Sequence, residues 1–303
     1  ESDRFAPDVP LERVEVFRGS RTEVLFEAPP HVPRLSASGS GFTCFLEGAV
    51  YARSDEELRA FAASLAGKAR AGEPLEAAVR GFMSGTDGEY VFVLVLEGGA
   101  RVVVFNDAWG RLPLYAARWP SVFALAREPA DLLPHLPEVR LDRQAIAEWL
   151  AFTFTMNPEW VVRGVAQVRP ATLFDVSVRD GGVRVAESCL LPVRLARTAP
   201  VLGGGAAVRR YAELFLEGFS ARARWLTGMG YRLTGDLSGG YDTRCILAGA
   251  LRLGLPMEYY TDELVTGDES ETARRLAETC GVAVTRVPQG PAIADEAEWR
   301  RLV

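Results

Sequence analysis

The sequence predicts two domains, a β-rich α+β domain followed by an α/β domain built on a parallel sheet. The chain has 303 residues, which is more than a single hydrophobic core usually supports. In the first half, two nearly continuous apolar runs flank a turn with two glycines, a pattern typical of paired, buried strands. In the second half, strands and helices alternate with short connections, which favours parallel strands joined by right-handed crossovers.

The first elements follow a turn-rich opening. Residues 1–40 hold several prolines and the polar stretch at residues 36–41, so they are predicted to be mostly turns. A strand is predicted over residues 42–50. Apolar residues at helical spacing then predict a helix over Asp55–Arg70, with Ser54 as its N-cap.

The clearest β-hairpin joins residues 90–96 to residues 101–105. Its loop is Glu97-Gly98-Gly99-Ala100, whose glycines can adopt positive φ. Because both runs are almost entirely apolar, these strands are predicted to be covered on both faces. Later elements of this domain, which is predicted to end near Pro192, are strands at residues 122–125 and 171–178 and a helix at Arg143–Phe152.

A linker over residues 197–205 is predicted to separate the two domains, because it contains Pro200 and Gly203-Gly204-Gly205. No Lys-Ser or Lys-Thr follows these glycines, so they are not a Walker-type loop. A helix over residues 207–227 comes next, with five apolar residues on one stripe: Val208, Tyr211, Leu214, Phe215 and Phe219. The elements predicted after it are, in order, a strand at 231–237, a helix over Tyr241–Leu253 ended by Gly254, a strand at 256–261, a helix at 269–279 ended by Gly281, a strand at 282–287 and a third helix beginning within 295–302.

The composition is that of a soluble globular protein. The chain is 48% hydrophobic and 24% charged, with a net charge of −6 and a pI near 5.3. Nucleic-acid binding is not expected, because basic residues do not cluster; the pairs Arg209-Arg210 and Arg274-Arg275 are interpreted as solvated helix faces. No apolar run reaches the ~18 residues of a membrane span and no leader opens the sequence, so a cytoplasmic location is expected.

Cysteine and histidine chemistry is not expected. The four cysteines show no regular spacing and no C-x-x-C: Cys44, Cys189, Cys245 and Cys280. The two histidines, His31 and His135, are interpreted as surface or structural residues. A disulfide framework and a zinc site are therefore both improbable.

The candidate functional site is the loop Ser238-Gly239-Gly240-Tyr241-Asp242-Thr243. Two glycines between a strand and a helix allow a tight turn, and the helix N-terminus favours an anion. Ser238 and Thr243 add hydroxyl groups at the two ends. A carboxylate at Asp242 would repel a polyphosphate unless a cation lies between them, so Mg²⁺ is expected there. The alternative is a plain strand–helix turn capped by Ser238 or Asp242.

This loop resembles the S-G-G-x-D-S loop of the ATP-pyrophosphatase superfamily, with Thr243 in place of the last serine. Further along, Asp268-Glu269-Ser270-Glu271-Thr272-Ala273-Arg274 followed by Leu276-Ala277 is similar to a segment of the asparagine synthetase family. In the first half, Asp87-Gly88-Glu89-Tyr90-Val91-Phe92 resembles that family's D-G-E-F-A-F strand start. Asn106-Asp107-Ala108-Trp109-Gly110-Arg111-Leu112-Pro113-Leu114-Tyr115 resembles its R-D-R-F-G-x-R-P-L-Y turn. The resemblance covers about residues 41–287.

The resemblance implies the fold and the ligands. Residues 1–195 would form an α+β sandwich of the Ntn-hydrolase type, as in class II glutamine amidotransferases. Residues 206–303 would form the N-terminal part of a parallel-sheet PP-loop ATP-pyrophosphatase domain. ATP and Mg²⁺ would be the cofactors: Ser238, Gly239, Gly240, Asp242 and Thr243 would bind the phosphates, and Asp242 would bind the metal.

The sequence departs from the family where glutamine is used. Glutamine-hydrolysing members begin with a nucleophilic cysteine, whereas this chain begins Glu1-Ser2-Asp3, and Cys44 is interpreted as a buried structural thiol. The family's N-G-E glutamine-binding turn is replaced by Glu47-Gly48-Ala49. Glutamine hydrolysis is therefore expected to be lost. About sixty residues follow the loop, so the synthetase half is interpreted as truncated, and no residue is assigned to the ligation step.

The leading interpretation is an ATP-dependent amide ligase that adenylates a small-molecule or peptide carboxylate and releases AMP and pyrophosphate. Family members with a degenerate glutaminase half, such as β-lactam synthetases and lasso-peptide cyclases, use amines other than glutamine-derived ammonia, and this chain is expected to resemble them. The alternatives are a glutamine-dependent asparagine synthetase and a non-catalytic nucleotide-binding or scaffold protein. Two assemblies are considered. One is a homodimer, and the other is a complex with a partner chain that supplies the rest of the synthetase domain.

Overall fold

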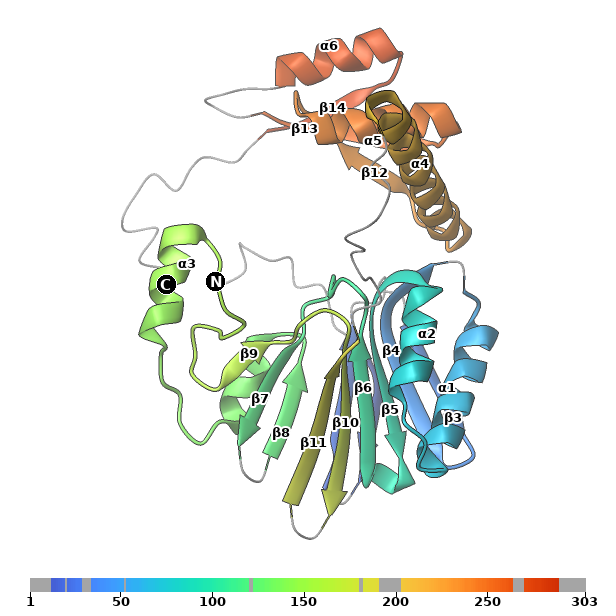
Figure 1. The fold of residues 1–303 in the computed structure, drawn as a ribbon. Helices are drawn as coiled ribbons and strands as arrows, with labels where there is room; N and C mark the ends of the chain where they lie inside the picture. The colour runs from blue at the N-terminus through green and yellow to red at the C-terminus, as the bar shows by residue number, and fades with distance from the viewer. Residues whose placement is uncertain are drawn as a thin grey trace. The chain divides into compact units, whose positions relative to one another are not determined.

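The computed structural model describes residues 12–19, 21–28, 34–51, 53–119, 122–179, 182–190, 203–263 and 270–288. The chain divides into two compact units, whose described parts are residues 12–190 and residues 203–288 (Figure 1). Within these residues, no helix combines the length and the apolar character that crossing a lipid bilayer requires.

The first unit is built on a six-stranded antiparallel sheet with the strand order β11-β10-β6-β5-β4-β3. Its strands are β3 (Arg34–Gly39), β4 (Phe42–Tyr51), β5 (Asp87–Leu96), β6 (Arg101–Asn106), β10 (Thr172–Arg179) and β11 (Gly182–Cys189). Strands β4 and β5 pair along ten residues each, and β5 and β6 are the two central strands of the sheet. A mixed α/β fold with antiparallel sheets was expected for this half of the chain, and the structure confirms it.

Two helices cover one face of this sheet and further strands cover the other (Figure 1). The helices are α1 (Asp55–Arg70) and α2 (Glu76–Ser84). The strands on the opposite face are the hairpin of β1 (Glu12–Arg18) and β2 (Glu23–Ala28) and a small antiparallel sheet of β7 (Tyr115–Trp119), β8 (Val122–Ala126) and β9 (Val165–Gln167). The remaining elements of this unit are the 3₁₀ turns η1 (Glu97–Gly99) and η2 (Pro129–His135) and the helix α3 (Arg143–Phe152).

The predicted hairpin is β5 and β6, and its loop has the expected geometry. Gly98 and Gly99 have φ of 62° and 96°, and Glu97 also has a positive φ of 53°. Alternate residues of β5 enter two separate hydrophobic clusters, one under the helices and one under the small sheet. The prediction that both faces of these strands are covered is therefore confirmed, and it explains why the two runs are apolar throughout.

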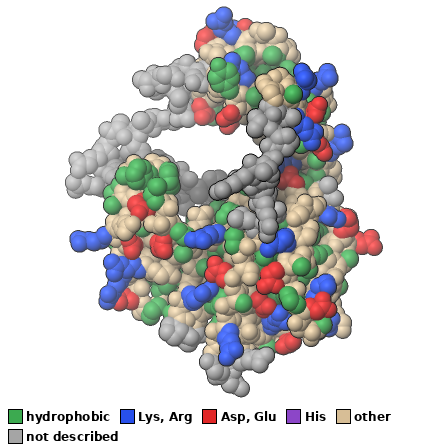
Figure 2. All heavy atoms as spheres, viewed as in Figure 1, with side chains coloured by type: hydrophobic (Ala, Val, Ile, Leu, Met, Phe, Trp, Pro, Cys, Tyr) green, Lys and Arg blue, Asp and Glu red, His purple; other side chains and the backbone are tan. Residues whose placement is uncertain are grey.

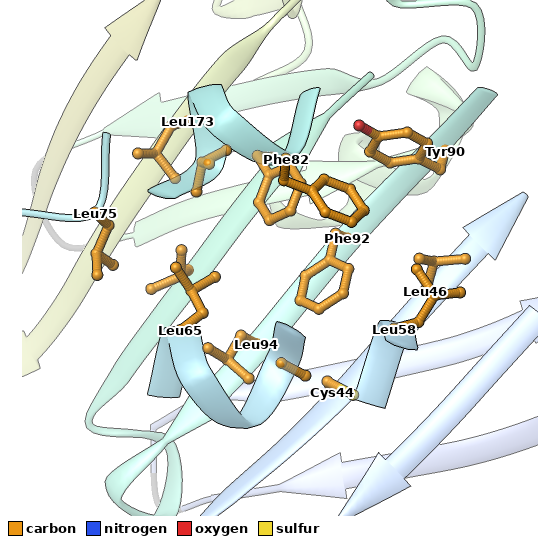
Figure 3. Close-up of a cluster of buried hydrophobic side chains, with 14 of the residues drawn as sticks. Cys44, Leu46, Leu58, Leu65, Leu75, Phe82, Tyr90, Phe92, Leu94 and Leu173 are labelled. Carbon is orange, nitrogen blue, oxygen red and sulfur yellow. The ribbon is translucent and has the colours of Figure 1, made fainter. Parts of the chain in front are cut away.

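The cluster between the helices and the sheet combines aliphatic side chains with a group of aromatic rings (Figure 3). Phe92 on β5 and Phe105 on β6 are stacked with ring centroids 4.9 Å apart. Phe61 of α1 stacks on Phe82 of α2 at 4.2 Å, which joins the two helices above the sheet. Cys44 of β4 lies in the same cluster and is completely buried, as predicted for a structural thiol.

Helix α1 begins as the sequence predicts. The Ser54 hydroxyl accepts a hydrogen bond from the Glu57 N–H at 3.2 Å, and the Glu57 carboxylate accepts one from the Ser54 N–H at 2.8 Å. This reciprocal capping box satisfies two donors that a helix N-terminus otherwise leaves unpaired. The same hydrogen bonds, led by that from the Ser54 backbone, hold the pKa of Glu57 below its ordinary value.

The second unit contains a three-stranded parallel sheet in the order β12-β13-β14. Its elements are α4 (Gly204–Gly228), β12 (Leu233–Asp236), α5 (Tyr241–Leu253), β13 (Met257–Glu263), α6 (Ser270–Cys280) and β14 (Val284–Pro288). Helix α5 ends at Gly254, which has φ of 63°, and Gly281 after α6 has φ of 68°. The core joins Leu237, Leu247 and Tyr259 with the alanines of α6.

Several predicted elements differ from the structure. The opening residues are not mostly turns: β1 and β2 form a hairpin, and β3 begins within the stretch that was predicted as a turn, because its small residues pair with β4. Helix α4 begins at Gly204, so two glycines of the predicted linker belong to the helix; residues 197–202 lie outside the described residues. The helix expected within residues 295–302 also lies outside them. Helix α2 and strands β7, β9 and β11 were not predicted.

Candidate functional site

The predicted phosphate loop lies between β12 and α5, after the carboxyl end of a parallel strand. Leu237 is buried, and its N–H donates to the Tyr260 carbonyl of β13 at 2.7 Å, so the strand pairing continues to the edge of the loop. Helix α5 begins at Tyr241 with Gly240 as its N-cap. Open α/β sheets bind ligands at this end of their strands, and the first N–H groups of a helix are not used within the helix.

The two hydroxyl side chains of the loop hold each other. The oxygen atoms of Ser238 Oγ and Thr243 Oγ1 lie 3.2 Å apart, and Thr243 Oγ1 accepts the Ser238 N–H at 3.2 Å. Ser238 Oγ also accepts the Gly240 N–H at 3.1 Å. Thr243 can donate its hydrogen to the carbonyl of Ser238 or of Gly240, both at 3.3 Å, which would leave the Ser238 hydroxyl hydrogen available to a ligand.

Asp242 is exposed on the first turn of α5, and its side chain makes no hydrogen bond or ion pair with the described residues. It does not cap the helix, because α5 has no side-chain cap. The carboxylate therefore fits a role as a single Mg²⁺ ligand, since Mg²⁺ is commonly held by one or two carboxylates together with phosphate oxygens. No group of three or more His, Cys, Asp or Glu residues that could hold a metal occurs in the described parts of the chain.

Arg244 is part of the loop's structure, and the sequence reasoning missed it. Its guanidinium donates to the carbonyls of Gly239 and Gly240 at 3.0 and 3.2 Å, and it lies 4.5 Å from the centre of the Tyr241 ring. The signal for this contact is its spacing, because residue 244 lies one helical turn after residue 240. Arg244 thus binds the outer, carbonyl side of the glycine turn.

In the first unit, Glu47-Gly48-Ala49 lies at the position of the glutamine turn, and Glu47 forms an ion pair with Arg127. Glu47 lies opposite Val91 in the β4–β5 pairing, and its Oε1 accepts from Arg127 Nε at 3.1 Å. Arg127 also donates to the Pro113 carbonyl. The family turn has an amide and a carboxylate at this place. Here Ala49 offers no polar side chain, and the Glu47 carboxylate is bonded to a neighbouring arginine.

The carboxylates at the start of β5 are also bonded to neighbours. Asp87 Oδ1 lies 3.1 Å from Arg111 Nη1, which also donates to the Gly88 carbonyl at 3.3 Å. Glu89 Oε1 accepts the Tyr51 hydroxyl at 3.1 Å. Asp87 and Glu89, which match acidic residues of the family motif, thus form contacts within the first unit. The structure assigns none of them a ligand.

The turn that resembles R-D-R-F-G-x-R-P-L-Y is organised by a buried carboxylate. Asp107 is 1% exposed, and it accepts the N–H groups of Trp109 at 2.8 Å, Arg111 at 3.0 Å and Tyr90 at 3.3 Å. Asn106 beside it bridges to the Arg169 carbonyl and the Thr172 N–H. Burial, and next the charge of Asp107, raise the pKa of Tyr90 well above its ordinary value.

The cysteines and the described histidine are placed as the sequence suggests. All four cysteines are free thiols; Cys44 is buried, Cys189 and Cys245 are exposed and Cys280 is half-buried. His135 is exposed at the end of η2, whereas His31 lies outside the described residues.

A family model, the glutamine amidotransferase domain, matches residues 76–187, which are less than half of the chain. The matched region runs from α2 to near the end of β11 and includes the buried Asp107 turn. The first unit therefore contains a glutamine amidotransferase-like domain. Domains of this kind are associated with amide and amidotransfer chemistry. No curated protein matches the chain in sequence.

Two solved structures share a distant likeness with the chain. One is the glutamine phosphoribosylpyrophosphate amidotransferase from B. subtilis complexed with ADP and GMP, at 11% identity, 87% coverage of this chain, 65% coverage of that chain and a TM-score of 0.29. The other is the allosteric regulatory enzyme of purine biosynthesis, at 12% identity, 86% and 63% coverage and a TM-score of 0.29. This chain spans less than two thirds of the length of either structure, and at these scores neither one defines its function.

Proposed function

We propose that this chain is a member of the asparagine synthetase family that uses ATP to form an amide bond, and that its amidotransferase-like unit does not hydrolyse glutamine. The observation that carries the proposal is the loop between β12 and α5. There the Asp242 carboxylate is exposed and unbonded among the described residues, next to the first N–H groups of a helix. A plain capped turn would have used Asp242 or another side chain as the cap.

In the proposed reaction, a substrate carboxylate attacks the α-phosphorus of ATP. A P–O bond forms, the bond to the β-phosphate oxygen breaks, and pyrophosphate leaves. An amine then attacks the acyl carbon of the adenylate, and AMP leaves with the bonding electron pair. The loop would bind the pyrophosphate as its charge develops, through backbone N–H groups and the helix dipole. Mg²⁺ held by Asp242 would offset the negative charge of the phosphates.

The first unit supports the second half of the proposal. The amide and carboxylate of a glutamine-binding turn are absent at Glu47-Gly48-Ala49, and Glu47 is in an ion pair with Arg127. Removing Arg127 from Glu47 to accommodate a glutamine would break an ion pair that is only partly exposed to solvent. We therefore infer that the amine of the proposed ligation is supplied by a substrate other than glutamine.

Replacing Asp242 by asparagine is expected to lower the rate of ATP–pyrophosphate exchange about a hundredfold, because the metal loses its protein carboxylate while the shape of the side chain is kept. The measurement is exchange of labelled pyrophosphate into ATP with Mg²⁺, first with aspartate and then with other amino-acid and peptide carboxylates. Glu217→Gln on α4 is the matched control, since it removes one exposed carboxylate from the same unit and should leave exchange unchanged. Equal exchange by both variants would contradict the role of Asp242. If the wild-type chain neither exchanges nor binds Mg·ATP, a non-catalytic scaffold is favoured.

The wild-type chain is expected to release no glutamate from glutamine above the rate of a heat-denatured sample. The reason is that no described side chain near Gly48 offers the amide and carboxylate pair that would hold the α-groups of glutamine. The measurement is enzymatic detection of glutamate, with and without Mg·ATP. Glutamate release at an ordinary enzymic rate would overturn this part of the proposal and favour a glutamine-dependent asparagine synthetase.

A further inference from the structure

Helix α3 is strongly apolar, yet the described residues of its own unit bury little of it. Seven of its ten residues are Ala, Ile, Trp, Leu or Phe, but Ala145 is its one buried residue. Leu150 is 74% exposed and Trp149 is 54% exposed. An apolar helix normally buries a stripe of about 100° against its own domain. In Figure 2, hydrophobic side chains gather over this helix.

The exposed apolar surface continues on both sides of the helix. Seven large hydrophobic residues within residues 139–156 are more than half exposed: Val139, Leu141, Trp149, Leu150, Phe152, Phe154 and Met156. A half-exposed aromatic ring leaves roughly 100 Å² accessible, so these residues together present an area on the order of several hundred Å². Apolar patches of that size mark interaction sites, and a standard protein–protein interface takes about 800 Å² from each partner.

A groove of about 740 Å³ runs along one side of α3. Its floor is apolar and is made by Leu141, Ile146, Ala147 and Leu150. Leu141 is held in place by a short antiparallel bridge to Val162, and next to it the Asp142 N–H donates to the Val161 carbonyl at 2.8 Å. The groove is shallow and open, so the apolar face of a bound helix could pack along it.

The charges around the groove are basic. Arg140, Arg143 and Arg163 line it, and no carboxylate does. Two of the three arginines reach acidic neighbours outside the lining: Arg140 pairs with Glu138 at 2.5 Å, and Arg163 lies 3.6 Å from Asp142. Arg143 makes no hydrogen bond or ion pair with the described residues. The carboxylate of α3 itself, Glu148, is occupied by Gln144 and by the Met156 N–H.

We propose that the groove of α3 is a docking site for an acidic amphipathic helix of a partner protein, whose apolar side chains enter the groove and whose carboxylates face Arg143 and its neighbours. A second copy of this chain fits less well, because a symmetric contact would bring two arginine-lined grooves together. An anionic membrane also fits less well. Membrane-surface helices have a strongly basic flank, whereas this surface carries Glu138 and Asp142 beside its arginines.

The test uses the full chain and a synthetic helical peptide of about fourteen residues, with leucines at positions i, i+3, i+4 and i+7 and glutamates on the flanks. Binding is followed by the anisotropy of a fluorescein-labelled peptide. The wild-type chain is expected to bind it, and Leu150→Glu and Arg143→Glu are each expected to weaken binding about tenfold or more, since they place a negative charge in the groove. Leu25→Glu is the matched control, because Leu25 is 52% exposed in the same unit but distant in sequence from α3, and it should bind as the wild type does.

Added salt is expected to weaken binding, and a scrambled peptide of the same composition is expected to bind at least tenfold less tightly. The proposal is overturned if the scrambled peptide binds equally, if no peptide binds, or if phosphatidylserine vesicles bind in a Leu150-dependent manner while the peptide does not. A concentration-dependent dimer that Leu150→Glu abolishes would show that a second copy occupies the groove.

Discussion

Replacing Gly48 by alanine is expected to destabilise the first unit by about 3 kcal/mol. Gly48 has φ of 97°, a conformation that costs an L-residue about 1–2 kcal/mol. A Cβ atom there would lie 2.1 Å from the Glu89 carbonyl oxygen and 2.7 Å from Leu112 Cδ1. The first of these atoms belongs to the backbone of the central strand β5, so it cannot move without opening the β4–β5 ladder, and overpacking of this kind adds about 1–3 kcal/mol.

The measurement is urea unfolding followed by circular dichroism and tryptophan fluorescence. Gly67→Ala in α1 is the matched control, because a Cβ at residue 67 meets no atom within 4 Å. That variant is expected to be about 0.5–1 kcal/mol more stable than the wild type, since alanine is the better helix former. If Gly48→Ala unfolds at the same urea concentration as the wild type, the backbones of β4 and β5 are not as close at residue 48 as the structure has them.

Gly48 illustrates what the sequence could and could not predict. The family resemblance marked it as the retained glycine of a glutamine turn, which suggests a role in binding. The structure supplies a steric reason that needs no ligand: the residue lies between two backbones in a conformation that favours glycine. The sequence shows that residue 48 is glycine. Its close approach to Glu89, which lies 41 positions further along the chain, depends on how β4 and β5 pair and in which register.

The fold was predicted best where a pattern is local and repeated. Helices α1, α3 and α5 begin and end at the predicted residues, because Ser54, Asp142 and Gly254 provide caps that can be recognised in the sequence. Strand β3 was missed because most of its residues are small or polar and it pairs with β4. Strands β1 and β2 contain Val, Leu and Phe and were missed because the prolines around them favoured a turn-rich interpretation.

The candidate site was predicted in its position but not in its contacts. The strand, the two glycines and the helix place the loop correctly between β12 and α5. The mutual hydrogen bond of Ser238 and Thr243 depends on side-chain geometry that no spacing rule supplies. The spacing of one helical turn from Gly240 permits the Arg244 contact, but it does not predict that the guanidinium binds the outer carbonyls. The ion pair of Glu47 with Arg127 could not be predicted either, because the two residues are 80 positions apart.

Replacing Asp107 by alanine is expected to destabilise the first unit at least as much as Gly48→Ala does. Such a loss would show that the turn organised by Asp107 is needed for the stability of the unit. Asp107→Ala removes the acceptor of three buried or half-buried backbone N–H groups, those of Tyr90, Trp109 and Arg111. Each buried donor that loses its partner costs about 1–3 kcal/mol, so the expected loss of stability is about 4 kcal/mol. The measurement is again urea unfolding.

Asp107→Asn separates the loss of hydrogen bonds from the loss of volume. The amide keeps the shape of the carboxylate but has a single acceptor oxygen, so its NH₂ group must face either the Trp109 N–H or the N–H groups of Tyr90 and Arg111. An isosteric substitution is therefore expected to cost about 2 kcal/mol. Tyr90→Phe is the control in the same place, because the buried Tyr90 hydroxyl has no hydrogen-bond partner among the described residues, and its removal should change stability by less than about 0.5 kcal/mol.

The two results would together identify the reason for the acidic residue in this motif. If Asp107→Asn destabilises the unit and Tyr90→Phe does not, the carboxylate is required because it closes the turn between β6 and β7 and ties it to β5. That requirement holds whether or not glutamine is hydrolysed, so an amidotransferase-like domain could keep this turn after losing its glutamine site. If Asp107→Asn is as stable as the wild type, the hydrogen bonds of the turn do not need the second oxygen, and the charge of Asp107 would have to serve a bound ligand instead.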